Sequence, residues 1–432
     1  MDPLVERILY WLPRAIKYQL TTKDSFLMPY YNGAKKRTSY HSGGNSRRTS
    51  YKSNRPARRG GGRHGQYIDP AKFVKIATAA EAEVYTPTHN FADFPVNETI
   101  KRNLIEKGFI TPSPIQDQVI PLVLEGKDVI GIANTGTGKT AAFAIPLIDE
   151  MLKNRQAKTL VIAPTRELAQ QIRVEFNNLT RGAFIKSAVL IGGSNMGFQI
   201  KDLKARPQLV IGTPGRIKDH IERKTLRLDD FKAVVLDEVD RMLDMGFIDD
   251  MRTILSSVGE GYQALFFSAT MDRKIEELIQ TFSHDPVTVS VKTGDTTDSV
   301  HQNVINYAHH SEKIDKLHDA LIEDVVEKVI VFEETQRDVE KLSNELASRG
   351  FAVDAIHGGK NQSQRQRALR KFKENEIDIL VATDVAARGI DVKDVTHVIN
   401  YTVPQTYEDY THRIGRAGRA GKIGHALTFV QK

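Results

Sequence analysis

A glycine-rich stretch near residue 136 carries the strongest chemical signal in the chain. After the apolar run 128–132 it reads Ala133-Asn134-Thr135-Gly136-Thr137-Gly138-Lys139-Thr140. The two glycines let consecutive backbone N–H groups point at phosphate oxygens, and a helix starting there adds partial positive charge. We expect Lys139 to reach the β- and γ-phosphates and Thr140 to ligate Mg²⁺. Ala133 replaces the first glycine of the GxxxxGK[ST] pattern, so an ordinary turn before a helix is the alternative.

A pair of acids supports the phosphate-binding interpretation. Asp237-Glu238-Val239-Asp240 directly follows the apolar run 233–236, about 100 residues after the glycine-rich stretch. In nucleotide hydrolases of this type, one acid at a strand end holds Mg²⁺ and the other orients a water molecule. By itself an Asp-Glu pair is usually a solvated loop, but its position after a phosphate loop favours catalysis.

Small residues, hydroxyls and arginines follow several other apolar runs. They occur at 164–169, 192–193, 213–216 and 268–270, and in the C-terminal part at 382–391 and 412–419. Because ligands bind at the carboxyl ends of parallel strands, we expect a polyanion to run along this edge. The arginines of 412–419 are spaced by three with glycine between them, which favours arginine fingers over a core element.

To bring these residues to one sheet edge, the chain must alternate between strands and helices. The first series consists of apolar runs that are separated by helical patterns such as 167–179 and 273–282. These runs are 128–133, 159–163, 187–191, 208–212, 233–236 and 264–267. A second series lies at 328–332, 353–356, 378–382, 396–401 and 425–430. Alternation of this kind predicts α/β domains with parallel sheets. We expect two tandem parallel-sheet α/β domains with a cleft between them, preceded by a disordered basic N-terminal tail.

The expected domain boundaries follow from composition. They are 1–30, an uncertain amphipathic arm; 31–68, the tail; 69–90, a lead-in segment; 91–291, the first domain, which contains the glycine-rich stretch; 292–300, a polar linker; and 301–432, the second domain. In the arm, apolar residues recur at helical spacing around Pro13, so a partner-binding or membrane-surface helix and a disordered arm are both open. A third hypothesis is that translation starts at Met28 instead of Met1.

The basic charge of the chain is concentrated in the tail. Residues 31–68 contain three Lys and seven Arg without an acid, a net charge of +10, whereas residues 69–432 carry −4 and the whole chain +7. Arginine interleaved with tyrosine suits phosphate contacts and base stacking without sequence preference. The alternative is a solubilising tail. Such a segment cannot bury a core, so we expect it to be disordered.

Composition excludes several classes of function. The 432 residues include no Cys, which rules out disulfides, thiolate metal sites and cysteine nucleophiles. The sequence has no 18-residue uncharged apolar stretch that could span a membrane, and no export or import signal, so we expect a cytoplasmic protein without membrane contact.

Taken together, the motifs resemble those of the DEAD-box ATP-dependent RNA helicases over residues 91–432, with a DEVD variant of motif II. The resemblance rests on about a dozen short motifs in the same order, including 108–116, the family's Q motif, and an aromatic residue at Phe91. It does not cover residues 1–90. It implies two tandem RecA-like domains and an RNA-dependent ATPase with ATP and Mg²⁺ as cofactors.

The resemblance also implies roles for individual residues. Catalysis would fall to Lys139, Asp237, Glu238, Arg416 and Arg419, and the metal to Thr140 and Asp237. ATP would be bound by Phe91, Phe109, Gln116, Asn134, Thr135, Gly136, Thr137, Gly138, Lys139, Thr140 and Asp391, with Gln116 and Phe109 on adenine and Asp391 on the ribose. Asp240, Ser268, Thr270 and His412 would couple the domains. RNA would be contacted through its backbone by Thr165, Arg166, Gly193, Thr213, Gly215 and Arg216, and by Gln362, Arg365 and Thr383 of the second domain.

Some positions depart from the family pattern. Val239 replaces an alanine next to the metal acids, which puts the coupling to 268–270 in question. Thr402 stands where an Asp is usual, and Glu333-Glu334 replaces a more neutral pair near the expected RNA path. Ala417 replaces a common Thr, which leaves Arg416 and Arg419 in place.

The sequence therefore predicts an ATP-dependent helicase that separates short RNA duplexes or remodels ribonucleoproteins. We expect sequence-nonspecific RNA binding and a monomer, with ribonucleoprotein or ribosome-assembly partners as an open expectation. The alternatives are an ATP-gated RNA clamp or scaffold, an RNA chaperone that acts through the tail, and a DNA translocase. The physiological RNA is not indicated by the sequence.

Overall fold

A computed structural model describes residues 68–77, 85–134, 136–291, 298–323, 325–387, 392, 394–418 and 422–432. The expectations for the arm 1–30, for the tail except its last residue, for most of the linker, and for Thr135, Asp391 and Arg419 lie outside the described residues. None of the described helices is long and apolar enough to cross a bilayer.

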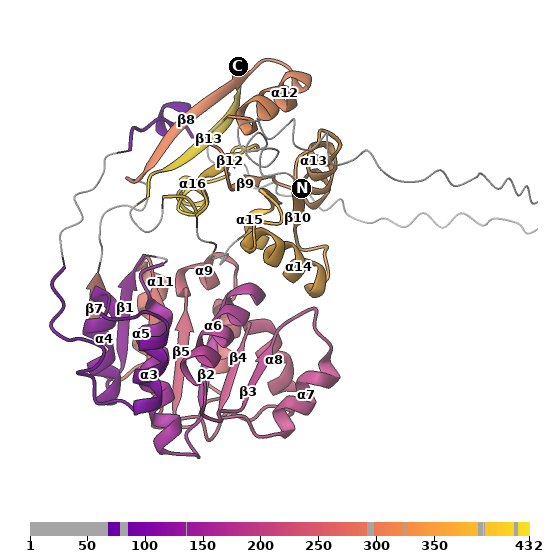
Figure 1. Ribbon diagram of the computed structural model, residues 1–432. Coiled ribbons are helices and arrows are strands. Elements are labelled where there is room, and N and C mark those ends of the chain that lie inside the picture. The colour runs from indigo at the N-terminus through magenta and orange to yellow at the C-terminus, as the bar shows by residue number, and fades with distance from the viewer. Residues whose placement is uncertain are drawn as a thin grey trace, which may run out of the picture. The chain divides into compact units, whose positions relative to one another are not determined.

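The first sheet has seven strands, and all its neighbours pair in parallel (Figure 1). In spatial order they are β3 (Ser187–Leu190), β4 (Leu209–Gly212), β2 (Thr159–Ile162), β5 (Ala233–Asp237), β6 (Gln263–Ser268), β1 (Val129–Ala133) and β7 (Val287–Val291). The helices around it are α3 (Glu98–Glu106), α4 (Pro114–Leu124), α5 (Lys139–Lys153), α6 (Arg166–Leu179), α7 (Met196–Lys204), α8 (Pro214–Glu222), α9 (Val239–Asp244), α10 (Ile248–Leu255) and α11 (Arg273–Phe282).

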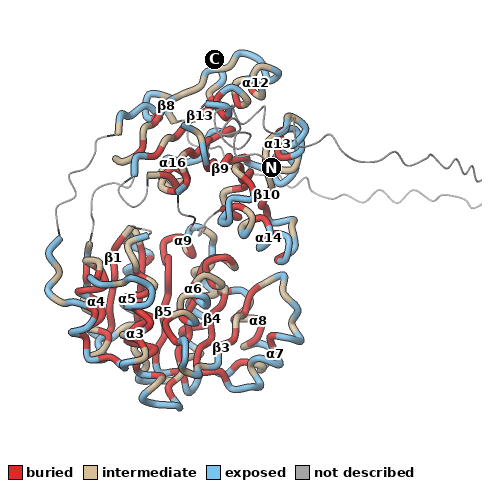
Figure 2. The backbone as a smooth tube through the Cα atoms, viewed as in Figure 1, coloured by how far each residue is buried: buried red, intermediate tan, exposed pale blue. Residues whose placement is uncertain are grey.

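Both faces of this sheet are buried. Neighbouring residues of a strand enter different apolar clusters: Val235 joins one with α3 to α6, and Val234 and Leu236 join the other, with α8 to α11. The central strands are accordingly buried along their length (Figure 2). Since side chains alternate across a sheet, continuous apolar runs are required for strands that are covered on both faces.

The second sheet has six parallel strands. In spatial order they are β10 (Val353–Ile356), β11 (Ile379–Ala382), β9 (Val329–Phe332), β12 (His397–Asn400), β13 (Gly424–Gln431) and β8 (Val300–Tyr307). Its helices are α12 (His310–Leu321), α13 (Gln336–Ser348), α14 (Gln362–Lys373), α15 (Asp384–Ala387) and α16 (Tyr407–Ile414), and a 3₁₀ turn, η1 (Pro70–Phe73), packs beside β8. Clusters with α14 to α16 on one face and α12 and α13 on the other cover this sheet.

The two parallel-sheet α/β folds that the alternation predicts are confirmed, and the eleven apolar runs correspond to strands. Two further strands, β7 and β8, were not predicted. Both lie at the edge of their sheet, where burial alternates or is partial instead of continuous. Polar residues are tolerated on such strands, so Val300–Tyr307 contains no continuous apolar run.

Candidate functional site

The phosphate loop lies between β1 and α5, as expected. Gly136 and Gly138 have φ values of 85° and 93°, which favour glycine. Lys139 is buried, and its Nζ donates to the Ala133 carbonyl at 2.7 Å. Thr137 Oγ1 donates to the Asn134 carbonyl at 2.8 Å, so the loop is held by its own residues.

Gln116 braces this loop from α4. Its Oε1 accepts from the Ser113 N–H at 2.9 Å and its Nε2 donates to the Gly138 carbonyl at 3.1 Å. Ser113 Oγ donates to the Thr137 carbonyl at 2.7 Å. A Cβ on Gly138 would lie 2.3 Å from Gln116 Nε2, so glycine is required there. Sequence reasoning missed this bracing, although the Ser-x-x-Gln spacing of a capping box could have indicated it.

The two aromatic residues assigned to ATP, Phe91 and Phe109, lie next to each other. Phe91 is buried in the core, with its ring 6.0 Å from Phe109 in an edge-on arrangement. Phe109 is partly buried, and Lys107 Nζ lies 5.7 Å from its centroid. Phe91 therefore supports Phe109 from the core side, and an adenine contact for either ring stays a prediction.

The paired acids end β5. Asp237 is 3% exposed, and its Oδ1 has no hydrogen-bond partner among the described residues. Burial raises its pKa to about 7; Lys139 opposes this increase, while Glu238 and Asp240 add to it. A buried carboxylate among other acids, with one oxygen unpartnered, fits a bound cation. Magnesium in phosphate sites commonly uses one or two carboxylates together with substrate oxygens.

Glu238 has an ion-pair partner that the sequence did not indicate. Its φ of 55° is left-handed, and its Oε2 lies 2.7 Å from Arg241 Nη1, with both side chains buried. Since an unpaired buried charge is costly, the ion pair with Arg241 compensates for burial of this side chain. Arg241 lies three residues later, one turn along α9, and that spacing was the available signal.

Asp240 joins β5 to the residues after β6. Its Oδ2 accepts from the backbone N–H groups of Ala269 and Thr270 at 2.8 and 3.0 Å, and its own N–H donates to Ser268 Oγ at 3.3 Å. Val239 is fully buried in the apolar cluster that includes α8 to α11. The additional methyl groups of Val239 thus pack in the core without breaking the link from Asp240 to 268–270.

Several residues assigned to RNA gather at the other strand ends of the first sheet. Arg166 begins α6, and its guanidinium covers Gly193, where a Cβ would come 2.2 Å from Nη1; the φ of Gly193 is 77°. Arg216 Nη1 donates to the Ser194 carbonyl at 3.3 Å. Thr165 and Thr213 occupy the N-cap positions of α6 and α8, only Thr165 with a side-chain bond to the helix, and Gly215 follows in the first turn of α8. The loop 192–194 is therefore flanked by two guanidinium groups.

A buried hydrogen-bonded chain holds this loop and was missed from the sequence. His220 is fully buried, with Nε2 3.2 Å from Gln199 Oε1 and Nδ1 2.8 Å from Thr225 Oγ1. Gln199 Nε2 donates to the carbonyls of Ile191 and Ser194 at 3.0 and 3.4 Å. Burial, reinforced by Arg216, lowers the pKa of His220, which favours a neutral ring.

The residues assigned to RNA on the second sheet are buried. Gln362, Arg365 and Thr383 are at most 8% exposed. Arg365 Nη2 forms a 2.7 Å ion pair with Glu167 Oε2, whose pKa is raised by burial against the opposing effect of Arg365. The Arg365 charge is thus already neutralised, and RNA contact by these three residues stays a prediction.

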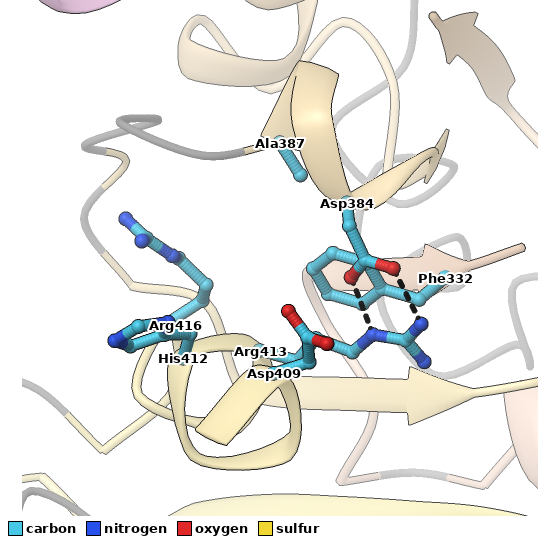
Figure 3. A pocket seen from close by; sticks show the side chains of 7 residues that line it. All are labelled: Phe332, Asp384, Ala387, Asp409, His412, Arg413 and Arg416. Atoms are coloured by element: carbon cyan, nitrogen blue, oxygen red, sulfur yellow. Dashed lines mark hydrogen bonds and ion pairs between the residues drawn. The ribbon is translucent and has the colours of Figure 1, made fainter. Parts of the chain in front are cut away.

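A small pocket on the second sheet contains the remaining assigned residues. It is lined by Phe332, Asp384, Ala387, Asp409, His412, Arg413 and Arg416 (Figure 3). Arg413 is fixed by Asp384, with Nε–Oδ1 and Nη2–Oδ2 distances of 2.6 and 2.7 Å. Arg416 and His412 lie at the other side of the pocket from this ion pair in Figure 3. Arg413 therefore stabilises the fold. Of the two arginines assigned as fingers, Arg416 is among the residues that the structure describes.

The structure accounts for Glu333 differently from the sequence. Glu333 is buried, and its Oε2 accepts from the Thr402 hydroxyl and from the Glu334 N–H, the latter at 3.1 Å. Glu334 is exposed and accepts from Gln405 Nε2 at 3.1 Å. Glu333 is therefore held inside the fold by Thr402 and is not exposed to repel RNA.

Comparison with known proteins gives consistent matches. Residues 113–278 match the family model of the DEAD/DEAH box helicases, and residues 312–421 match the helicase conserved C-terminal domain. The ATP-dependent RNA helicase CshA of Listeria monocytogenes is 48% identical over 342 residues, 79% of this chain and 66% of that protein. The DEAD-box ATP-dependent RNA helicase CshA of Bacillus subtilis is 47% identical over 344 residues, 79% of this chain and 70% of that protein.

Two solved structures resemble the fold. Dbp5 of S. cerevisiae bound to RNA and ADP BeF3 matches with a TM-score of 0.70 and 28% identity, over 79% of this chain and 89% of that chain. Mss116p bound to ssRNA and AMP-PNP matches with a TM-score of 0.69 and 30% identity, over 78% of this chain and 73% of that chain.

Proposed function

The chain belongs to the DEAD/DEAH box helicase family and is an ATP-dependent RNA helicase, and we propose that its described residues divide binding, hydrolysis and RNA contact as follows. The observation that carries this proposal is the convergence of three strand ends. The phosphate loop follows β1, the paired acids end β5, and the residues bonded to Asp240 follow β6; β1 and β5 both pair with β6.

ATP binding is assigned to the loop and to α4. Gly136 and Gly138 present backbone N–H groups to the phosphates, and the start of α5 adds its dipole. Lys139 exchanges the Ala133 carbonyl for phosphate oxygens. Gln116 hydrogen-bonds the adenine edge and Phe109 packs on its ring, which favours adenine over guanine. The bracing of Gly138 by Gln116 links base recognition to the shape of the phosphate loop.

Hydrolysis is assigned to the acids and to the arginine finger. Asp237 and Thr140 would hold Mg²⁺, which when bound neutralises charge on the phosphate oxygens. Glu238 Oε2 is held by Arg241, and Oε1, which has no partner among the described residues, accepts a hydrogen bond from the attacking water. Arg416 stabilises the charge that develops on the transferred phosphate, together with Arg419, which lies outside the described residues.

RNA contact is assigned to Arg166, Gly193 and Arg216, with backbone N–H groups at the starts of α6 and α8. These groups bind phosphate and carry no sequence information, so binding is sequence-nonspecific. Binding of both ligands to a closed state, with Asp240, Ser268, Thr270 and His412 coupling the domains, would separate a short duplex through differential affinity. We further propose a cytoplasmic monomer that acts on ribonucleoproteins.

Steady-state ATPase activity with and without poly(U) RNA tests this proposal. RNA should stimulate the wild-type chain, and Glu238→Gln should lower kcat by about 10²- to 10⁴-fold. Glu260→Gln, the same change at an exposed acid, is the matched control and should retain full activity. Unchanged turnover in Glu238→Gln would reject the assignment of Glu238. Stimulation without separation of a short RNA duplex would favour the clamp.

A further inference from the structure

A short segment before the first domain packs on the second sheet. Phe73, at the end of η1, is 1% exposed and belongs to the apolar cluster of β8, β12 and α16. Its ring centroid lies 4.7 Å from that of Tyr410, which is fully buried. The side chain of Asp69 caps η1 by accepting from the Ala71 N–H at 2.9 Å. The family models begin only at residue 113, so no role is assigned to this segment by resemblance.

Backbone and charged contacts fix the same segment. Lys75 N–H donates to the Gln302 carbonyl at 3.0 Å, and Gln302 N–H donates to the Lys75 carbonyl at 2.8 Å, which adds an antiparallel bridge to the edge strand β8. Lys75 Nζ lies 2.6 Å from Asp298 Oδ1. The Ala77 N–H donates to His301 Nδ1 at 3.1 Å. Ring packing on α16, two backbone hydrogen bonds and a bond to His301 on β8, and an ion pair to Asp298 together fix the position of this segment.

The contacts converge on the helix that leads to the arginine finger. Tyr410 lies in the middle of α16, and its hydroxyl donates to Gln302 Oε1 at 3.0 Å. Phe73 and Lys75 therefore hold Tyr410 from two directions, by ring packing and through Gln302. The helix ends at Ile414, two residues before Arg416, and Ile414 belongs to the same cluster as Phe73.

Next along the chain, the segment is tied to the first domain. Asp117 on α4 accepts from the Tyr85 hydroxyl at 2.6 Å and from the Thr88 N–H at 2.7 Å. Residues 69–77 thus lie between the tail and a second attachment point on α4, the helix that also carries Gln116. The chain before the first domain therefore makes non-covalent contacts with the second sheet through residues 69–77 and with α4 through Tyr85 and Thr88.

We propose that residues 69–77 form a clasp that positions α16, and through it Arg416, for hydrolysis. Phe73 is a positioning residue, since it acts through Tyr410 and not on the substrate. This inference rests on the proposed function of Arg416. Because misplacement of a catalytic group by about 1 Å can lower a rate by about 10²-fold, loss of the clasp should lower kcat. The KM for ATP should stay within about twofold, because the loop and Gln116 belong to the first sheet.

The test compares Phe73→Ala with wild type and with Phe184→Ala in the full chain. Phe184 is 70% exposed, so its variant controls for loss of a phenyl group. RNA-stimulated kcat and KM for ATP are measured on folded protein, together with amide hydrogen exchange of the peptide that contains α16. We expect at least a tenfold lower kcat, an unchanged KM and faster exchange in α16, with partial recovery in Phe73→Leu.

Two results would overturn the clasp. One is faster exchange in α16 with unchanged kcat; the other is a loss of activity that only follows the unfolded fraction. If Phe73→Ala does not fold, Lys75→Pro provides an independent test with the same measurements, because it removes the N–H donor to Gln302. Failure of the proposed function is distinguishable, because wild type and Phe184→Ala would then show no RNA-stimulated hydrolysis either.

Discussion

Three histidines on neighbouring strands of the second sheet should make its stability depend on pH. His397 on β12 pairs in register with His425 on β13, which pairs with His301 on β8. The rings of His397 and His425 stack at 4.7 Å and 11°, and those of His425 and His301 at 5.4 Å and 26°. We call these residues the histidine ladder. Burial, with a smaller effect of His425, lowers the pKa of His397 to about 4.

The sign and magnitude follow from proton linkage. An unfolded histidine has a pKa of about 6.5, so between pH 6.5 and 4 the unfolded chain binds more protons at His397 than the folded chain. The free energy of unfolding therefore falls as pH decreases through this window. For a folded pKa of about 4, the loss between pH 7 and pH 5 is about 2 kcal/mol. His425 adds to it, since burial and His301 lower its pKa, against the opposing effect of Glu323.

Urea unfolding followed by far-UV circular dichroism at pH 7, 6 and 5 measures this dependence. His397→Phe keeps a stacked ring but cannot be protonated, so its stability should fall by about 2 kcal/mol less than that of wild type. His310→Gln, at an exposed position, should follow wild type. The quantity compared is the change with pH, so a constant offset in the variant does not matter. Parallel curves for wild type and His397→Phe would refute the reasoning.

Three further predictions concern the site. Arg241→Met leaves the Glu238 carboxylate buried without its partner. The free energy of unfolding should fall by about 3 kcal/mol in urea unfolding, and kcat should fall at least about tenfold in ATPase assays. Thr402→Asp places a second carboxylate against Glu333 and should lower the free energy of unfolding by about 1–3 kcal/mol. The double variant with Glu333→Gln should regain stability in the same unfolding assay. Gly193→Ala forces a Cβ into the overlying guanidinium at positive φ and should weaken poly(U) binding about tenfold by fluorescence anisotropy.

The sequence was sufficient for features that depend on local chemistry. The phosphate loop, the acids after β5 and the buried strands follow from glycine, carboxylate and continuous apolar runs, whose physical requirements are local. Helix α11 coincides with its predicted range because Asp272 caps it and its apolar face is regular. The edge strands β7 and β8 were missed because an edge strand need not be apolar throughout.

Features that depend on long-range contacts could not be predicted. Lys75 and Asp298 are 223 residues apart, and Glu333 and Thr402 are 69 apart, so no local pattern links them. The same holds for the ring pair of Phe73 and Tyr410. Only the tertiary fold decides which polar partner a buried residue finds.

The charge distribution supports the prediction that the basic tail contributes to RNA binding. Three arginines near the assigned site residues have buried or partly buried acids as partners: Arg241 is paired with Glu238, Arg365 with Glu167 and Arg413 with Asp384. These charges stabilise buried acids and are not available to a polyanion without exchange of partners, and residues 69–432 carry −4 in total. Residues 31–68 carry +10 and directly precede the clasp, so they can concentrate RNA near a folded body that has little net attraction for it. We therefore predict that the tail supplies most of the long-range attraction, while the folded body supplies geometry and hydrolysis.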